Sequence, residues 1–76
     1  MKITLGGQLS YQLPGHPRHL EVQLEAPARL EEVLTGLGIL LPEIYLVVVN
    51  GELVELQTAL VSQQDEVKLY PPVDGG

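Results

Sequence analysis

Residues 44–54 read IYLVVVNGELV, and this stretch decides the fold. The run 44–49 is apolar and rich in β-branched side chains, which is typical of a strand buried in a sheet. Asn50–Gly51 follows at once, and this pair is the strongest short-range signal for a two-residue hairpin turn. Residues 52–54 then supply the returning strand. The stretch therefore predicts an antiparallel hairpin.

Downstream of this hairpin, residues 66–70 read EVKLY and predict the last strand. Successive side chains of a strand point to opposite faces of its sheet. We therefore expect Val67 and Leu69 to face the core, and Lys68 and Tyr70 to face outward. The two prolines that follow lack the N–H group a sheet needs, so they end the strand. The stretch LQTALVSQQD, between the predicted hairpin and the predicted last strand, is expected to be an irregular connection.

Upstream of the hairpin, the sequence predicts one amphipathic helix. Its apolar residues recur with the spacing i, i+3, i+4 and i+7, namely at Leu30, Val33, Leu34 and Leu37. This spacing places all four on one helix face. Pro27 suits the first helical position, where its missing N–H costs nothing, and Gly38 suits the position that ends a helix.

The first part of the chain carries a different period. Apolar residues occur at odd-numbered positions, namely Ile3, Leu5, Leu9, Tyr11 and Leu13. This period of two predicts a strand, and residues 20–25 alternate in the same way. The proline- and glycine-rich segment 14–17 reads as the turn between two antiparallel strands. Gly6–Gly7 interrupts the first strand and indicates a bulge, a bend or a close approach of another backbone.

Together these elements predict an α+β fold with the order ββαβββ. We expect a mixed sheet of about five strands with one main helix packed on one face. Residues 1–70 would form the single domain and residues 71–76 an extended tail. A domain of this size buries only about 60% of the surface of its unfolded chain, so its core is small.

The composition excludes several classes of protein. Ten acidic residues against four basic ones give a formal charge of −6, which disfavours nucleic acids and anionic membranes as partners. The charge suits a partner with a basic face, or it serves solubility alone. The chain has no cysteine, no run of about 20 apolar residues that could span a bilayer, and no apolar segment typical of a signal peptide. We expect a cytoplasmic protein.

The side chains of the domain offer little catalytic chemistry. His16 and His19 lie in the predicted turn, but a metal site needs three or four convergent ligands, so we expect two solvated histidines and no metal. Glu31 and Glu32 are adjacent on the helix and point in different directions, as in a solvated helix face. A free-standing enzyme is therefore a poor interpretation of this chain.

The tail, PPVDGG, is the remaining candidate for chemistry. Pro71–Pro72 favours an extended path away from the sheet. Gly75 and Gly76 have no side chains, so they could pass through a channel too narrow for a Cβ atom. Either the tail is a thin arm that presents the carboxylate of Gly76, or the glycines simply fray at a chain end.

The segments VVNGELVE and DEVKLYPPVDGG resemble the small sulfur-carrier proteins of the MoaD/ThiS type, which include the small subunit of molybdopterin synthase. The resemblance spans the chain and is most specific over residues 47–54 and 65–76. It implies the ubiquitin-like β-grasp fold. The paired prolines before the two glycines are more like the molybdopterin branch than the thiazole branch.

The resemblance also implies a mechanism centred on Gly76, preceded by Gly75. A ubiquitin-activating-type adenylyltransferase (MoeB/ThiF-like) would use ATP to adenylate the Gly76 carboxylate, and a sulfur donor would convert it to a thiocarboxylate. The arm would then enter the large subunit of molybdopterin synthase (MoaE-like). The chain itself would bind no cofactor and would not be catalytic alone. Partner contacts are expected from the residues that match the family motifs: Leu53, Tyr70, Pro71, Pro72 and Val73. For Tyr70, simple coverage of the sheet is an equal alternative.

Three positions depart from the family pattern. Gly6–Gly7 replaces the bulky residues that are common in the first strand, and Gln64–Asp65 replaces the usual Gly–Asp before the last strand. Asp74 adds a negative charge beside the glycines and is either solvated or used in choosing a partner. Three alternatives stay open: a carrier for thiazole or another sulfur pathway, a ubiquitin-like modifier conjugated through Gly76, and a plain interaction domain with an inert tail.

Overall fold

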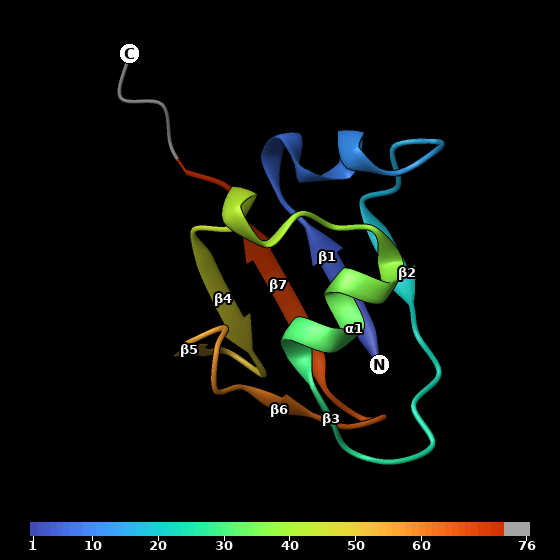
Figure 1. The fold of residues 1–76 in the computed structure, drawn as a ribbon, viewed down its shortest axis with the longest axis vertical. Helices are drawn as coiled ribbons and strands as arrows, with labels where there is room; N and C mark the ends of the chain where they lie inside the picture. Colours follow the sequence, from blue (N-terminus) through green and yellow to red (C-terminus); the bar gives the residue numbers. More distant parts are fainter. Residues whose placement is uncertain (73–76) are drawn as a thin grey trace.

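The computed structural model describes residues 1–72. Within this range the chain forms one α-helix, two short 3-10 helices and seven strands (Figure 1). In chain order these are β1 (Lys2–Leu5), η1 (Gly7–Gln12), β2 (His19–Glu21), β3 (Ala28–Arg29), α1 (Leu30–Leu37), η2 (Leu41–Glu43), β4 (Leu46–Val49), β5 (Glu52–Val54), β6 (Leu60–Val61) and β7 (Glu66–Tyr70).

Five of the strands form one mixed sheet in the order β2-β1-β7-β4-β5. The first and last strands, β1 and β7, pair in parallel, and the other neighbours pair antiparallel. Helix α1 lies across one face of this sheet (Figure 1). Strands β3 and β6 make a separate two-stranded ribbon. The α+β prediction is confirmed, and the architecture is that of the ubiquitin-like β-grasp.

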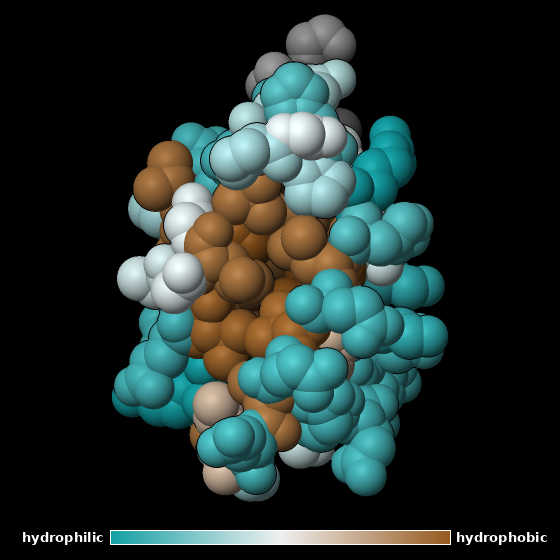
Figure 2. Space-filling model, turned by 90° about the vertical axis from the view of Figure 1, so that its right-hand side faces the viewer, coloured by the Kyte–Doolittle hydropathy of each residue, from teal (hydrophilic) through white to brown (hydrophobic). Residues whose placement is uncertain are grey.

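The core lies between α1 and the covered face of the sheet. Leu5 of β1 and Val47 of β4 both oppose Leu69 of β7, and all three are buried together with Leu30 and Leu34 of α1. Figure 2 views the molecule from the β2 side and shows apolar side chains that reach the surface on this flank, framed by polar residues. The edge strand β2 has only three residues, and the core residues themselves are at most 3% exposed.

The predicted hairpin is present with a shorter first strand. Strand β5 has the predicted bounds, and Asn50 and Gly51 both have positive φ angles, 52° and 84°, as a type I′ turn requires. Strand β4 begins at Leu46 and not at residue 44. The expectation of a fully buried strand is wrong, because α1 covers only one face and Val47 alone is buried in β4.

The N-terminal prediction needs two corrections. The first strand ends at Leu5, and residues 7–12 form η1 instead of continuing the strand. Gly7 has a φ of +52°, which turns the chain out of the extended path, so the period of two that continues to residue 13 is not a strand signal there. The second strand spans only residues 19–21 and not 20–25. The Val22 N–H still donates to the Met1 carbonyl oxygen, but the Leu24 N–H donates to the Gln63 side-chain oxygen, so the chain leaves β1 here.

Helix α1 also begins later than predicted. It starts at Leu30 and not at Pro27, because Ala28–Arg29 pairs with Leu60–Val61 to form the small ribbon. Gly38 ends the helix as predicted, with a φ of 90°. Strand β6 was not predicted because a strand of two residues is too short to show a period.

Asp65 fixes the turn before the central strand β7. Its carboxylate accepts hydrogen bonds from Asn50 Nδ2 at 2.9 Å and from the Ser62 N–H at 2.8 Å. Asn50 Oδ1 in turn accepts one from the Glu66 N–H at 3.0 Å. The bond from Asn50, followed by the one from Ser62, holds the pKa of Asp65 below its ordinary value. Gln64–Asp65 therefore provides a closed turn without the family glycine.

Replacement Asp65→Asn should destabilise the protein in a pH-dependent way. Because the pKa is lowered by folding, the stabilisation is present above about pH 4 and is lost as the pH falls through the lowered value. We expect a loss of roughly 0.5–1 kcal/mol at pH 7 from this partly solvated site, measured by urea unfolding. The control is Glu66→Gln, an exposed neighbour. An Asp65→Asn deficit of the same size at pH 2.5 would contradict the assignment.

Candidate functional site

The candidate site is the root of the tail, where the chain leaves the centre of the sheet. Strand β7 ends at Tyr70, whose carbonyl oxygen accepts a hydrogen bond from the Tyr45 N–H at 2.8 Å. Pro71 has no N–H, so the ladder cannot continue past Tyr70. Figure 1 shows the chain leaving β7 at the end of the molecule where η1 and η2 lie.

The paired glycines after β1 lie directly against this root. The Gly6 N–H donates to the Leu69 carbonyl oxygen at 2.8 Å. A Cβ atom placed on Gly6 would lie 3.0 Å from that oxygen and 3.0 Å from Tyr70 Cδ1, and one on Gly7 would lie 2.8 Å from Pro71 Cγ. The predicted close approach of another backbone is confirmed at Gly6, and the predicted bend is confirmed at Gly7.

A hollow opens beside the tail root between the two 3-10 helices. The Gln12 side-chain oxygen accepts a hydrogen bond from the Leu40 N–H at 2.7 Å, which ties η1 to the segment before η2. The hollow is lined by Gly7, Gln8, Leu9, Gln12, Leu40, Glu43, Tyr70, Pro71 and Pro72. Neither 3-10 helix was predicted; the signals in the sequence were the bend at Gly7 and the proline at position 42.

The open face of the sheet carries an apolar patch that continues to the tail root. Leu53 of β5 opposes Val48 of β4, and Leu46 of β4 opposes Tyr70 of β7. Directly opposed residues share a face, so these four residues form what we call the open-face patch. Leu53 is 67% exposed and Tyr70 41%. Lys68 and Tyr70 face outward as predicted, whereas Leu46 was not predicted to be exposed because residues 44–49 were expected to form a buried strand.

Of the predicted tail residues, only Pro71 and Pro72 belong to the part of the chain that the structure describes. Pro71 is half-buried against Gly7, and Pro72 is exposed. Val73, Asp74, Gly75 and Gly76 lie outside the described residues. The roles assigned to Gly75 and Gly76 as carrier residues, and to Val73 in partner binding, therefore stay predictions.

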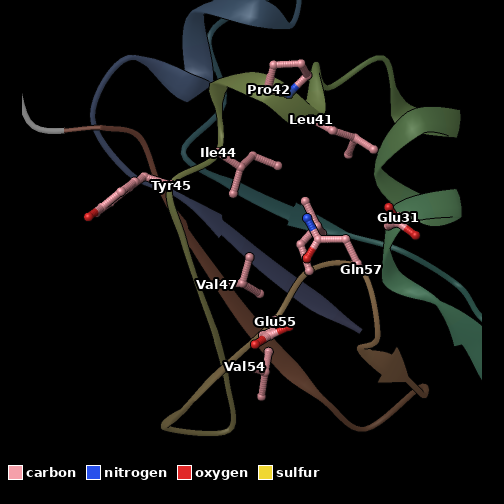
Figure 3. Close-up of a pocket in the computed structure, with 10 residues that line it drawn as sticks. Glu31, Leu41, Pro42, Ile44, Tyr45, Val47, Val54, Glu55 and Gln57 are labelled. Atoms are coloured by element: carbon pink, nitrogen blue, oxygen red, sulfur yellow. The ribbon is translucent and has the colours of Figure 1, made fainter.

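A second hollow lies on the helix side, between α1, η2 and the β4–β5 edge. Figure 3 shows Leu41 and Ile44 pointing into it and Tyr45 pointing away. Glu31 and Glu55 are the only charged residues of its lining, and Glu31 forms an ion pair with Arg29 at 2.8 Å. The lining has no histidine, serine, cysteine or lysine. The groups of this lining that could exchange a proton with a ligand are the two carboxylates and the Tyr45 hydroxyl, which points away from the hollow.

The two histidines make separate contacts. The His16 ring packs edge-on against Tyr11 with centroids 4.8 Å apart, and His19 Nδ1 lies 3.3 Å from Thr4 Oγ1. Residues 1–72 contain no group of three or more histidine, cysteine, aspartate or glutamate side chains that could hold a metal ion. None of the helices in this part of the chain is both long and apolar enough to cross a bilayer.

The chain was compared with protein-family models and with curated proteins. The model of the ThiS family matches residues 11–76, which covers the helix, the hairpin, the central strand and the whole tail. The search of curated proteins gave no match. The family match agrees with the β-grasp architecture. The chain belongs to the ThiS family.

Proposed function

We propose that this protein is a sulfur carrier whose Gly76 carboxylate is adenylated by a partner enzyme and then converted to a thiocarboxylate. Membership of the ThiS family supports a sulfur-carrier role, and the match that continues through Gly76 is the observation that carries the proposal. We further propose that the sulfur goes to molybdopterin, with this chain as the small subunit of the synthase. The paired prolines of the tail support that branch.

The proposed chemistry takes place on a carboxylate, which by itself is a poor acylating group. An oxygen of the Gly76 carboxylate attacks the α-phosphorus of ATP, and pyrophosphate leaves. A hydrosulfide donor then attacks the carbonyl carbon of the acyl-adenylate, and AMP leaves. Sulfur thus replaces one oxygen of Gly76. This route uses no cysteine thiol of the carrier, which is compatible with a chain that has no cysteine.

The partners would supply the catalytic groups. A MoeB/ThiF-like adenylyltransferase would bind ATP and activate Gly76, and a MoaE-like large subunit would bind the pterin precursor. The formal charge of −6 on this chain favours basic partner surfaces. Conjugation of Gly76 to lysines of other proteins uses the same activated carboxylate, so a ubiquitin-like modifier is the second candidate, favoured by the Gly–Gly ending.

Intact-mass measurement of the protein purified from its native cell tests the proposal. We expect a species heavier than the unmodified chain by one exchange of sulfur for oxygen, together with proof that Gly76 is the last residue. Loss of molybdoenzyme activity on gene deletion would support the molybdopterin branch, and a thiamine requirement would support the thiazole branch. Protein conjugates with a Gly–Gly remnant and no sulfur-bearing species would contradict the carrier and favour the modifier.

The open-face patch is the proposed docking surface for these partners. Leu53→Ala removes an exposed apolar side chain from this patch and should weaken binding to the large subunit about tenfold, as for an interface anchor. The matched control is Leu60→Ala, the same substitution at a residue that is 68% exposed in β6 and outside the patch. Equal dissociation constants for the two variants in titration calorimetry would contradict docking through this patch.

A further inference from the structure

We propose that Gly6–Gly7 is a positioning element for Gly76: a seat without side chains that fixes the direction in which the tail leaves the domain. The inference rests on the proposed function, because a direction matters only if a partner must receive the carboxylate. It assigns a role to two residues that depart from the family pattern and that no catalytic step uses directly.

The first part of the seat is Gly6. Strand β1 pairs in parallel with β7 up to Leu5 and Leu69, and the Gly6 N–H extends this ladder by one bond to the Leu69 carbonyl oxygen. Any Cβ atom on Gly6 would crowd that oxygen and the Tyr70 ring, both at 3.0 Å. A side chain at position 6 would therefore force the end of β7 to shift by a few tenths of an ångström, whereas glycine lets the two backbones stay this close.

The second part of the seat is Gly7, which contacts the tail itself. A Cβ atom on Gly7 would lie 2.8 Å from Pro71 Cγ and 3.3 Å from Pro71 Cδ. The proline ring is closed onto its own backbone, so it cannot swing aside as a flexible side chain could. A side chain at position 7 would therefore displace the backbone of the tail root.

The tail root is held from its other side as well. The Tyr45 N–H donates to the Tyr70 carbonyl oxygen at 2.8 Å, next to the β4–β7 ladder. Tyr70 thus sits between a backbone bond from the β4 side and the glycines that follow β1. Because both neighbours are main chain, the exit direction is set by the fold and does not depend on side-chain rotamers.

The short reach of the tail makes this direction important. If Gly76 carries the carboxylate, as proposed above, four residues lie between Pro72 and the end of the tail, and four extended residues span at most about 14 Å. A displaced root moves the whole volume that the carboxylate can reach. A misplacement of about 1 Å at reacting groups can lower a rate about a hundredfold. The open-face patch lies on β4, β5 and β7 and is not altered by position 7, so docking should survive a change there.

The test measures pyrophosphate release from ATP by each MoeB/ThiF-like adenylyltransferase of the same genome. Gly7→Ala should lower kcat about 10- to 100-fold with KM nearly unchanged. The matched control is Gly15→Ala, because Gly15 also has a positive φ, +78°, but nothing within 4 Å of an added Cβ. Gly15→Ala suffers the same kind of backbone strain and should keep the wild-type kcat.

A double-variant cycle separates the seat from general damage. Pro71→Ala removes the ring, so the loss caused by Gly7→Ala should be much smaller in that background than in the wild type. Pro71→Ala alone should lower kcat with little change in unfolding midpoint, which keeps the test usable if Gly7→Ala folds poorly. An NMR contact between Gly7 Hα and the Pro71 ring in the wild type provides a readout without any enzyme.

The outcomes distinguish the two proposals. Two results with an adenylated wild type would contradict the positioning role and leave the carrier function intact. The first is an equal kcat for Gly7→Ala and Gly15→Ala, and the second is additivity of the Gly7 and Pro71 effects. If none of the adenylyltransferases releases pyrophosphate with the wild type, the carrier function is overturned, and the positioning role falls with it even where the NMR contact is present.

Discussion

Deletion of Gly76 should lower the rate of pyrophosphate release by the activating enzyme more than about a hundredfold. The shortened chain would still end in a carboxylate, but on Gly75, about 3.5 Å short of the reacting position. That distance exceeds the misplacement that already costs about a hundredfold at reacting groups. The elements of the sheet and helix all lie within residues 2–70, so we expect the unfolding midpoint to stay unchanged.

Two comparisons make this deletion informative. Gly36→Ala alters a glycine in α1 that has nothing within 4 Å of an added Cβ, and this variant should be adenylated like the wild type. Gly76→Ala keeps the length of the tail and adds one methyl group. Comparison with the deletion therefore distinguishes an effect of tail length from an effect of a narrow channel in the partner. Normal adenylation of the chain that lacks Gly76 would refute the role of its carboxylate.

Replacement Leu69→Ala should produce the largest loss of stability in the domain. Leu69 has no exposed surface, lies on the central strand β7 and opposes Leu5 and Val47 on the neighbouring strands. Removing a buried leucine side chain costs about 2–5 kcal/mol through lost burial and the cavity left behind. The free energy of unfolding of natural domains is only about 5–15 kcal/mol, so this substitution would remove much of the stability of this small fold.

Urea unfolding followed by circular dichroism measures this loss, because the chain has no tryptophan to report by fluorescence. The thermal midpoint should fall by roughly 10 °C or more. Leu60→Ala makes the same chemical change at an exposed residue and should stay within about 0.5 kcal/mol of the wild type. A loss below about 1 kcal/mol for Leu69→Ala would mean that the core does not depend on the centre of β7.

The sequence predicts those elements in which the local residue pattern agrees with the contacts that the element makes in the fold. The Asn50–Gly51 turn requires positive φ angles that these residues adopt, and the alternation of residues 66–70 matches a strand covered on one face. The pattern misleads where tertiary contacts override it. Most of the period of two in residues 7–13 lies in the 3-10 helix that begins at Gly7 and ends at Gln12, and Ala28–Arg29 pairs with a strand too short to have a period.

The same contrast applies to the candidate site. Tyr70 could be assigned to the open face because its orientation follows from alternation along β7 alone. Leu46 was missed, since a continuous apolar run does not tell which faces of a strand are covered. Gly7 and Pro71 lie side by side although they are 64 positions apart in the sequence. A local sequence pattern cannot reveal a contact between residues so far apart. The bend at Gly6–Gly7 was visible, but its partner was not.

The central position of β7 has a consequence for biosynthesis. This strand is the last to be made, and it joins β1, the first, to β4. A growing chain therefore cannot complete its sheet before residues 66–70 have been made and can pair with both β1 and β4. Parallel pairing between chain ends is slow to form because of the long loop it closes. A chain that stops before β7 lacks the middle of its sheet, so proteolysis would remove it. Folding therefore selects against chains that stop before β7. A chain that lacks only residues of the tail keeps every strand of the sheet and escapes this selection.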